Sequence, residues 1–269
     1  MMTIFGRIYL LNNMRRTFLC SLLVLLATSA FAISPERTYK HTPSDYGLKY
    51  EQSTVQTDDG YGISVWHIPT RRARASVVVA YPDAGNMAYW LSLAFYLNYL
   101  HYDVWLFDWR GFGESSDFET KREMLFYDEY VSDLSTVLNT VEFKCRKPVV
   151  LMGYSMGTIV INEYLNRVKD KRIKAAVCDG FVGDPYSYVS RLNAQGKNVI
   201  LLEHYEYPGA STGIPSLYIS ATQDKFCTKK EIPQEATAIK EFDCGHIMGL
   251  SSFKEEYIST LDSFLKNNL

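Results

Sequence analysis

Hydrophobic and polar positions along the chain predict short buried strands that alternate with helices. Residues 75–81 form a continuous apolar run rich in valine, as expected of a strand that is buried on both faces. Apolar runs of the same kind predict further strands at residues 103–107, 148–152, 173–178, 216–220 and 239–242. Apolar residues at helical spacing predict helices at residues 88–100, 119–141, 158–168 and 253–265.

The order of these elements indicates the fold class. Strands that alternate with helices are joined by parallel crossovers, so the sheet is covered on both faces. Residues 55–57 and Gly62–Ile68 flank the turn Asp58-Asp59-Gly60, which predicts a hairpin. We therefore expect an α/β fold with a mostly parallel central sheet, an antiparallel N-terminal hairpin and helices on both faces. In open sheets of this kind, reactive side chains gather at the carboxyl ends of the strands.

The N-terminal segment predicts the compartment. An apolar run over residues 18–32 follows Arg15 and Arg16 and closes with Ala30-Phe31-Ala32, the small-residue pattern that signal peptidases cleave. The run is shorter than the roughly 20 residues that a membrane-spanning helix needs. We expect a signal peptide at residues 1–32, one domain at residues 33–269 and no stable membrane span after cleavage. The mature protein is then exported, either to a periplasm or out of the cell. Met14 remains an alternative start.

The composition of the chain limits the classes of ligand and partner that we expect it to bind. The chain is 47% hydrophobic and 22% charged with a formal net charge of −2, which gives no electrostatic reason to expect nucleic acid. No C-x-x-C spacing or histidine cluster suggests zinc, so we expect no metal and no organic cofactor. The expected partner is a small-molecule or acyl substrate. The sequence gives no indication of the oligomeric state.

A nucleophile motif follows one of the predicted buried strands. The segment Gly153-Tyr154-Ser155-Met156-Gly157 is a G-x-S-x-G that lies between a strand and a helix. A sharp turn there exposes the serine hydroxyl, and only small residues two positions before and after it let the chain pass. The turn also directs the backbone N–H of Met156 toward a developing oxyanion. We therefore assign Ser155 as the nucleophile.

A base and an orienting acid are expected at other strand ends. His246 follows the last strand, and Asp224 follows the strand before it, so the chain order is serine, acid, histidine. Asp243 and Glu241 compete for the acid role, but they precede His246 on its own strand. Four other histidines of the mature chain occupy less suitable places: His41, His67, His101 and His204.

Cysteines give a structural hypothesis about the same loops. Cys227 comes three residues after Asp224, and Cys244 comes two before His246. If acid and base meet, the two thiols come close, and an oxidising compartment would join them. A disulfide here would tether the acid loop to the base loop and add roughly 3 kcal/mol of stability.

The motifs together resemble the α/β-hydrolase superfamily from about residue 50 to the end of the chain. The resemblance is to the small-lid branch related to dienelactone hydrolases, serine aminopeptidases and depalmitoylating thioesterases. Its signature segments are Asp108-Trp109-Arg110-Gly111-Phe112-Gly113-Glu114-Ser115 and Ala84-Gly85-Asn86-Met87. The resemblance implies an α/β-hydrolase fold with a short lid, which we place at about residues 180–214.

One departure from the family pattern concerns the oxyanion hole. Where the family usually has His-Gly before the donor residue, this chain has Tyr81-Pro82, followed by Asp83. We assign the backbone N–H groups of Asp83 and Met156 as the two donors. A carboxylate at Asp83 repels a developing oxyanion if the side chain points inward.

These assignments predict a serine hydrolase that cleaves a carboxylic ester or thioester through an acyl-enzyme. Two alternatives remain open: a serine aminopeptidase-like peptidase and a non-catalytic binding protein on a hydrolase fold. The lid carries four tyrosines that either line the acyl or leaving-group wall or only cover the sheet: Tyr186, Tyr188, Tyr205 and Tyr207.

Overall fold

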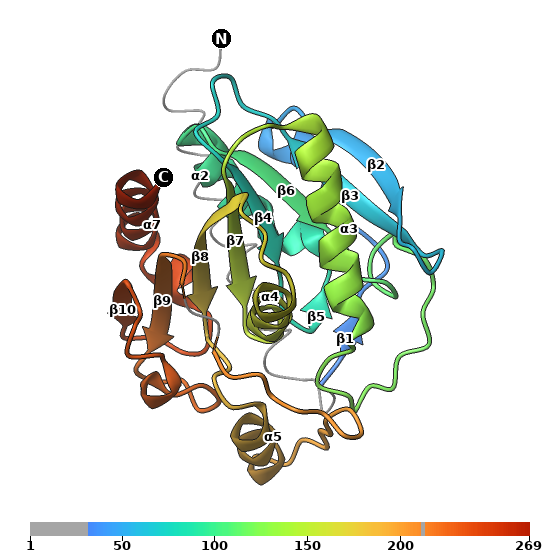
Figure 1. Ribbon diagram of the computed structural model, residues 1–269, viewed down its shortest axis with the longest axis vertical. Coiled ribbons are helices and arrows are strands. Elements are labelled where there is room, and N and C mark those ends of the chain that lie inside the picture. Colours follow the sequence, from blue (N-terminus) through green and yellow to red (C-terminus); the bar gives the residue numbers. More distant parts are fainter. Residues whose placement is uncertain (1–31, 211–212) are drawn as a thin grey trace.

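The computed structural model describes residues 32–210 and 213–269, which are built around one eight-stranded sheet (Figure 1). The strand order is β10-β9-β8-β7-β4-β6-β3-β2, and neighbours are parallel except at β2–β3 and β3–β6. The strands are β2 (Glu51–Gln56), β3 (Gly62–Ile68), β4 (Ser76–Ala80), β6 (Asp103–Phe107), β7 (Val149–Tyr154), β8 (Ile173–Asp179), β9 (Ser216–Ala221) and β10 (Ala238–Phe242). The mostly parallel sheet with an antiparallel N-terminal hairpin is confirmed.

Helices cover both faces of the sheet and explain why its central strands are apolar. Helices α3 (Glu129–Lys144) and α4 (Met156–Arg167) lie in front of the sheet in Figure 1. On the other face, α7 (Lys254–Asn268) lies next to α2 (Leu91–Tyr99), and Lys254 stacks over the ring of Tyr96. Strands β4, β6 and β7 are buried along their whole length, as a valine-rich strand between two helical layers must be.

Shorter elements surround the carboxyl ends of the strands. Helix α5 (Pro185–Ala194) lies beyond this edge (Figure 1), and the Asp184 side chain caps its first turn. A small parallel pair, β1 (Ser34–Pro35) with β5 (Ala84–Gly85), holds the start of the domain against the loop that follows β4. The other short elements are η1 (Pro43–Tyr46), η2 (Met87–Trp90), η3 (Lys229–Glu231) and α6 (Gly249–Ser252).

The helix predicted at residues 119–141 begins only at Glu129, so that boundary was wrong. The segment before it pairs instead with the region between α5 and β9: Leu125 N–H donates to the Ile200 carbonyl, and Ile200 N–H donates to the Glu123 carbonyl. The buried side chains of Leu125 and Phe126 fix this segment as a loop. Tertiary pairing overrides the helical spacing of its apolar residues.

The predicted signal peptide lies almost entirely outside the described residues. Its last residue, Ala32, is described, and the N–H groups of Ala32 and Ile33 both donate to the Arg122 carbonyl. Both residues are buried against the folded domain. Among the described residues, no helix has the length and apolar character needed to cross a bilayer.

Candidate active site

The turn between β7 and α4 holds Ser155 in an unusual backbone conformation. Its φ of 49° and ψ of −117° lie in a region that non-glycine residues rarely adopt. Little space remains for a side chain at the two neighbouring glycines, and least of all at Gly157. A Cβ on Gly157 would lie 1.9 Å from the Ala80 carbonyl oxygen, and one on Gly153 would lie 2.8 Å from the side chain of Ile161. The turn therefore presents the hydroxyl at the carboxyl edge of the sheet.

The structure brings His246 and Asp224 to this serine. The His246 Nε2 atom lies 2.8 Å from the Ser155 Oγ, and the His246 Nδ1 lies 2.7 Å from the Asp224 Oδ2. The other oxygen of Asp224 accepts the N–H groups of Phe226 and Cys227 at 2.8 and 3.0 Å. Burial acts to raise the pKa of Asp224, but the electrostatic interaction with His246 and the hydrogen bonds from His246, Phe226 and Cys227 outweigh it and lower the pKa.

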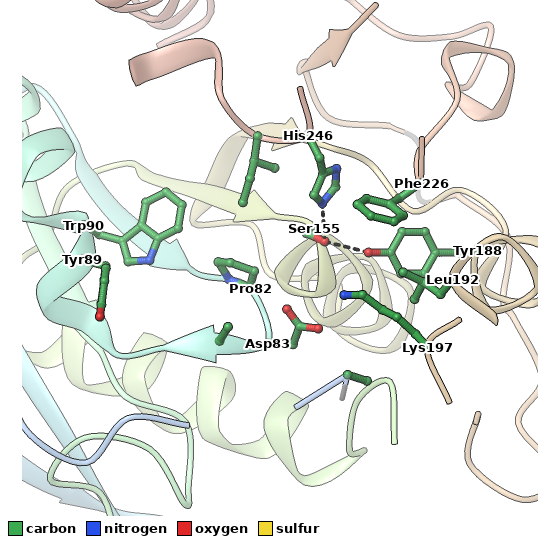
Figure 2. Close-up of a pocket in the computed structure, with 13 residues that line it drawn as sticks. Pro82, Asp83, Tyr89, Trp90, Ser155, Tyr188, Leu192, Lys197, Phe226 and His246 are labelled. Atoms are coloured by element: carbon green, nitrogen blue, oxygen red, sulfur yellow. Dashed lines mark hydrogen bonds between the residues drawn. The ribbon is translucent and has the colours of Figure 1, made fainter. Parts of the chain in front are cut away.

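Tyr188 makes a second contact to the serine that the sequence did not predict. Its phenol oxygen lies 3.1 Å from the Ser155 Oγ (Figure 2). The Asp224 carboxylate requires the imidazole proton on Nδ1, so Nε2 accepts and Ser155 donates to it. Since the serine hydroxyl has one proton, Tyr188 must then be the donor to Oγ. Burial raises the pKa of the Tyr188 phenol, which keeps that proton in place.

Asp179 is a further buried acid beside the site that the sequence analysis did not single out. It ends β8, its carbonyl accepts the N–H of Ser155 at 2.9 Å, and its carboxyl accepts the Tyr257 hydroxyl at 2.8 Å. Burial raises the pKa of Asp179 to about 7. Because its carboxyl is bonded to Tyr257 while Asp224 faces the imidazole, Asp179 does not replace Asp224 as the partner of His246.

A pocket opens in front of Ser155 (Figure 2). Most of its wall is apolar: Ala32, Pro82, Trp90, Leu192, Phe226 and Ile247. Two charged side chains, Asp83 and Lys197, also line it. The sequence predicted the first of these but gave no indication of the second, which lies in the segment between α5 and β9.

Asp83 points its carboxyl into this pocket, as Figure 2 shows. Burial raises its pKa to about 6, against the opposing effects of Lys197, the residue's own backbone N–H and His246. The carboxyl is therefore mostly ionised at neutral pH and lies on the side of the pocket where the Asp83 N–H was expected to donate. Met156, the other expected donor, is the first residue of α4.

With this geometry in view, comparison with known proteins identifies the fold. A family model described as the alpha/beta hydrolase fold matches residues 81–199. The chain is an α/β-hydrolase-fold protein. The esterase Pf2001 of Pyrococcus furiosus superimposes with a TM-score of 0.68 at 20% identity, covering 88% of this chain and 98% of the esterase. A hydrolase from Pseudomonas aeruginosa superimposes with a TM-score of 0.60 at 16% identity, covering 80% and 98%.

Curated relatives of this α/β-hydrolase-fold protein are more similar in sequence but match over a shorter region. The uncharacterized protein YfhR of Escherichia coli K12 is 27% identical over 174 residues, which cover 62% of this chain and 60% of YfhR. The uncharacterized membrane protein YNL320W of Saccharomyces cerevisiae is 26% identical over 148 residues, covering 54% and 49%. The chain thus matches about half to three fifths of the length of these relatives.

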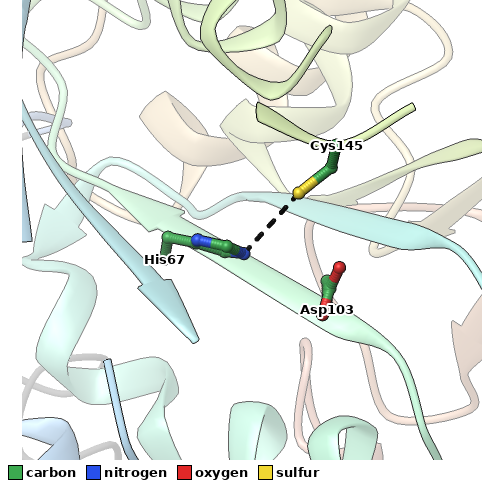
Figure 3. Close-up of side chains that lie close together, drawn as sticks. All are labelled: His67, Asp103 and Cys145. Carbon is green, nitrogen blue, oxygen red and sulfur yellow. Dashed lines mark hydrogen bonds between the residues drawn. The ribbon is translucent and has the colours of Figure 1, made fainter. Parts of the chain in front are cut away.

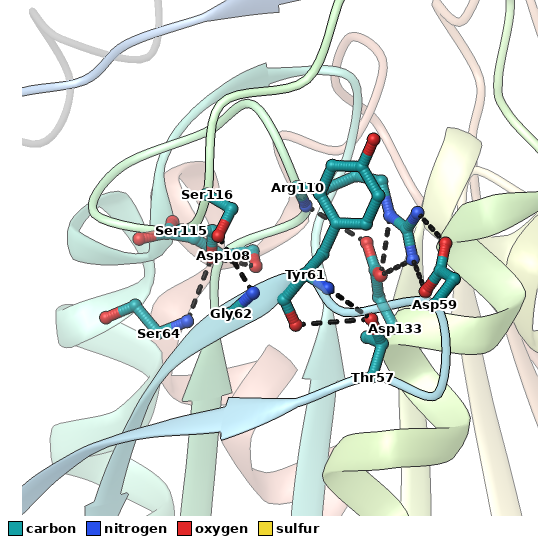
Figure 4. Close-up of polar contacts among 10 residues, drawn as sticks. All are labelled: Thr57, Asp59, Tyr61, Gly62, Ser64, Asp108, Arg110, Ser115, Ser116 and Asp133. Carbon is teal, nitrogen blue, oxygen red and sulfur yellow. Dashed lines mark hydrogen bonds and ion pairs between the residues drawn. The ribbon is translucent and has the colours of Figure 1, made fainter.

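The segment Asp108–Ser115, one of the two that carry the family resemblance, makes polar contacts with the N-terminal hairpin and α3 (Figure 4) and with the loop after β4. The buried Asp108 carboxyl accepts the Tyr81 hydroxyl at 3.0 Å and the Met87 N–H at 2.8 Å. It also accepts the Tyr39 hydroxyl. These bonds fix the loop after β4, which contains Pro82 and Asp83. A Cβ on Gly113 would overlap the Asp108 carboxyl, which explains that glycine.

Arg110 of the same segment forms a buried ion-pair network. Its side chain lies between Asp133 on α3, at 2.7 Å, and Asp59 in the hairpin turn, at 2.6 Å. Its guanidinium also stacks on the ring of Tyr61. Arg110 thereby connects the N-terminal hairpin to α3, a structural task rather than a catalytic one.

The predicted disulfide between Cys227 and Cys244 is absent from the described part of this α/β-hydrolase-fold protein, so that prediction is corrected. All four described cysteines are free. The Cys227 thiol instead donates to the Gly180 carbonyl at 3.2 Å, because the acid loop directs it inward, toward the end of β8.

Two groups of described residues have the composition of a metal site. Asp224, Cys227 and His246 belong to the site above, and His67, Asp103 and Cys145 form the second (Figure 3). In the second group the Cys145 Sγ lies 3.9 Å from the His67 Nε2. Burial and the Asp103 charge raise the pKa of Cys145, which favours the protonated thiol over the reactive thiolate.

Proposed function

We propose that the protein is a serine hydrolase that cleaves a carboxylic ester or thioester through a covalent acyl-enzyme. The observation that carries this proposal is the unbroken chain of hydrogen bonds from Asp224 through His246 to Ser155, at 2.7 and 2.8 Å. The strained backbone at Ser155 is consistent with a nucleophile held by its surroundings.

In the first step Ser155 attacks the substrate carbonyl and His246 takes the hydroxyl proton at Nε2. Asp224 keeps the imidazole in the tautomer with its proton on Nδ1 and stabilises the cation that forms. His246 then gives its proton to the leaving group. In the second step His246 activates a water molecule, which releases the acyl group and regenerates Ser155.

Tyr188 takes part in this reaction as a hydrogen-bond donor. Before attack its phenol donates to the Ser155 Oγ. As Oγ bonds to the substrate carbon it becomes a poorer hydrogen-bond acceptor, while the carbonyl oxygen on that carbon gains negative charge in the tetrahedral intermediate. The phenol then donates to this oxygen together with the Met156 N–H. A donor that acts on charge present only in the transition state raises kcat rather than substrate affinity.

The pocket supports an acyl group of modest size. Its wall is mostly apolar, and Trp90, Leu192 and Phe226 supply large surfaces for a hydrocarbon or aromatic group. The similarity to an esterase of Pyrococcus furiosus agrees with ester chemistry at the level of the fold.

A second candidate function follows from Asp83. A carboxylate inside the pocket can pair with the free ammonium group of a substrate, as a peptidase acting on the amino end of a peptide requires. The pKa of about 6 leaves Asp83 mostly ionised at neutral pH. A panel of uncharged p-nitrophenyl esters and aminoacyl p-nitroanilides separates the two candidates.

The experiment that tests the proposal is labelling with a fluorophosphonate probe, followed by peptide mapping. We expect one label per chain at Ser155, none in Ser155→Ala and much slower labelling in His246→Ala. A folded wild-type protein that takes up no label would overturn the proposal. That result would favour the non-catalytic binding protein, in which the Asp83 carboxylate prevents oxyanion formation.

A further inference from the structure

The edge of the sheet opposite Ser155 is strongly basic. Parallel strands begin at the same edge, so the loops that precede β8, β7 and β4, which are neighbours in the sheet, lie side by side (upper side of Figure 1). These loops and the residues that flank them carry ten cationic side chains: Arg71, Arg72, Arg74, Lys144, Arg146, Lys147, Lys169, Lys171, Arg172 and Lys174. We call these ten residues the basic edge.

Most of this charge is not neutralised within the protein. Arg74 pairs with Asp262, Lys144 with Glu51, and Arg172 with Asp170 and Glu142. The other seven cations are exposed and form no ion pair among the described residues. The chain as a whole has a net charge of −2, so the basic edge is a local concentration of charge and not a property of the average surface.

Exposed apolar side chains accompany the cations. Val168, which directly precedes Lys169, is 41% exposed, and Tyr99, at the end of α2, is 73% exposed. Tyr99 lies beside the loop that begins with Arg71, because the neighbouring Asn98 donates to the Ile68 and Pro69 carbonyls just before that residue. Two of the large apolar side chains that the described residues expose therefore lie at the basic edge.

We propose that the basic edge binds the surface of an anionic phospholipid membrane. Cationic side chains on a protein surface are attracted to anionic headgroups, and each one near the surface adds to the affinity. Tyrosine is enriched at the membrane interface because its ring is apolar and its hydroxyl is polar, and Val168 adds apolar area. A nucleic-acid duplex would use the cations, but its bases are stacked inside and it offers no apolar layer for these two side chains.

The fold then sets the orientation of the bound protein. Ser155 and its pocket lie at the carboxyl edge of the sheet, so a protein held by the basic edge directs its pocket away from the bilayer. The membrane does not cover the pocket, which stays open to the aqueous phase. Membrane binding and catalysis are therefore separable.

The experiment is cosedimentation of the purified protein with phosphatidylcholine vesicles that contain either no phosphatidylglycerol or about 30 mol % of it. We expect binding to the anionic vesicles that falls steeply between about 50 and about 500 mM salt. The triple variant Arg72→Glu/Lys169→Glu/Lys171→Glu should lower the partition coefficient at least about tenfold. A matched control, Lys121→Glu/Lys225→Glu/Lys230→Glu, changes the net charge equally but lies elsewhere and should keep wild-type binding.

Three results would overturn the proposal: equal binding of the wild type and the edge variant, equal loss in the matched control, or binding to duplex DNA without binding to anionic vesicles. Thermal unfolding of both variants serves as the folding control, since all six substituted side chains are exposed. Tyr99→Ala adds an independent readout. It should weaken the binding that remains at high salt and leave the salt dependence unchanged.

Discussion

The hydroxyl of Ser155 has two partners, His246 at 2.8 Å and Tyr188 at 3.1 Å, and one proton to give. Because His246 accepts that proton, Tyr188 is left as the donor. The hydrogen bond from Tyr188 to Ser155 therefore has a role beyond packing at the wall of the pocket. In the proposed acyl transfer, Tyr188 is a neutral donor near the oxygen that becomes negative, and it supplements the Met156 N–H where the Asp83 carboxylate is unfavourable.

Removing this donor tests its role. Tyr188→Phe should lower kcat for an ester substrate by about 100- to 1,000-fold with little change in KM, as the loss of one oxyanion donor does. Tyr186→Phe on the same helix is the matched control and should keep the wild-type kcat. Steady-state kinetics distinguish this role from that of a wall residue, whose loss would raise KM and leave kcat unchanged.

The charge of Asp83 has a consequence that depends on pH. Its carboxyl is neutral below its pKa of about 6 and anionic above it, and only the anion opposes an oxyanion. Asp83→Asn should therefore raise kcat/KM for an uncharged ester by about tenfold at pH values well above 6 and have little effect near pH 5. The ratio of the two pH–rate profiles measures this. A ratio that does not change with pH would contradict the assignment.

At the residue scale, the sequence was sufficient to predict the three residues that directly follow strands and meet at one edge of the sheet. Ser155, Asp224 and His246 each follow a strand, and alternation of strands with helices is enough to bring the ends of parallel strands to one edge. Tyr188 and Lys197 were not found as contacts of the site, because the packing of α5 and the segment after it decides which way they point. The direction of the Asp83 carboxyl could not be predicted from the sequence either, because packing around the loop after β4 determines it.

At the scale of elements, the site depends on the segment that joins β6 to α3. Asp108 holds the loop after β4, while Arg110 fastens the hairpin to α3 through Asp59 and Asp133. Arg110 and Asp133 are both fully buried, so each one's charge depends on the other.

Removing one partner of the Arg110–Asp133 ion pair should lower the stability of the fold strongly. Asp133→Ala leaves a buried guanidinium with only the half-exposed Asp59 as partner, and we expect a loss of about 3–5 kcal/mol in the free energy of unfolding. Asp117→Ala removes an exposed partner of Arg37 and should cost less than about 1 kcal/mol. Urea unfolding followed by circular dichroism measures both. Equal effects would show that burial does not determine the contribution of the pair.

Strand positions were easier to predict than helix boundaries. A buried strand appears in the sequence as a short apolar run, independent of its tertiary contacts. For this reason β6 and β3 were predicted with the bounds that the structure has. The helix start expected at residue 119 failed because residues 123–125 pair with Ile200, a partner 75 or more residues away in the sequence. The disulfide was wrongly predicted for a similar reason, since the Cys227 thiol bonds to the carbonyl of Gly180, which directly follows β8 and lies far from Cys227 in the sequence.

At the scale of the whole molecule, the sheet has two different edges: a carboxyl edge with the pocket and an amino edge with the ten cations of the basic edge. Export of the protein is a further proposal at this scale. It rests on the apolar run over residues 18–32 and the Ala30-Phe31-Ala32 pattern.

Cleavage after Ala32 should leave a mature chain that begins at Ile33. Ile33 is buried next to Ala32, which lines the pocket before cleavage, and the Ile33 N–H donates to the Arg122 carbonyl, a bond that the new terminal ammonium group can keep. Intact-mass measurement of protein recovered from the exported fraction tests this. A mass that corresponds to an uncleaved chain, or a protein confined to the cytosol, would contradict the proposal.

The most direct test of the central claim is to trap the acyl-enzyme. The protein is mixed with a p-nitrophenyl ester, quenched in acid within the first turnover and examined by intact-mass and peptide mass spectrometry. We predict that the chain gains the mass of one acyl group on Ser155, and that Ser155→Ala gains none and releases no burst of p-nitrophenol. Hydrolysis that proceeds equally in Ser155→Ala, or an acyl group carried on another residue, would contradict the proposal that Ser155 is the nucleophile.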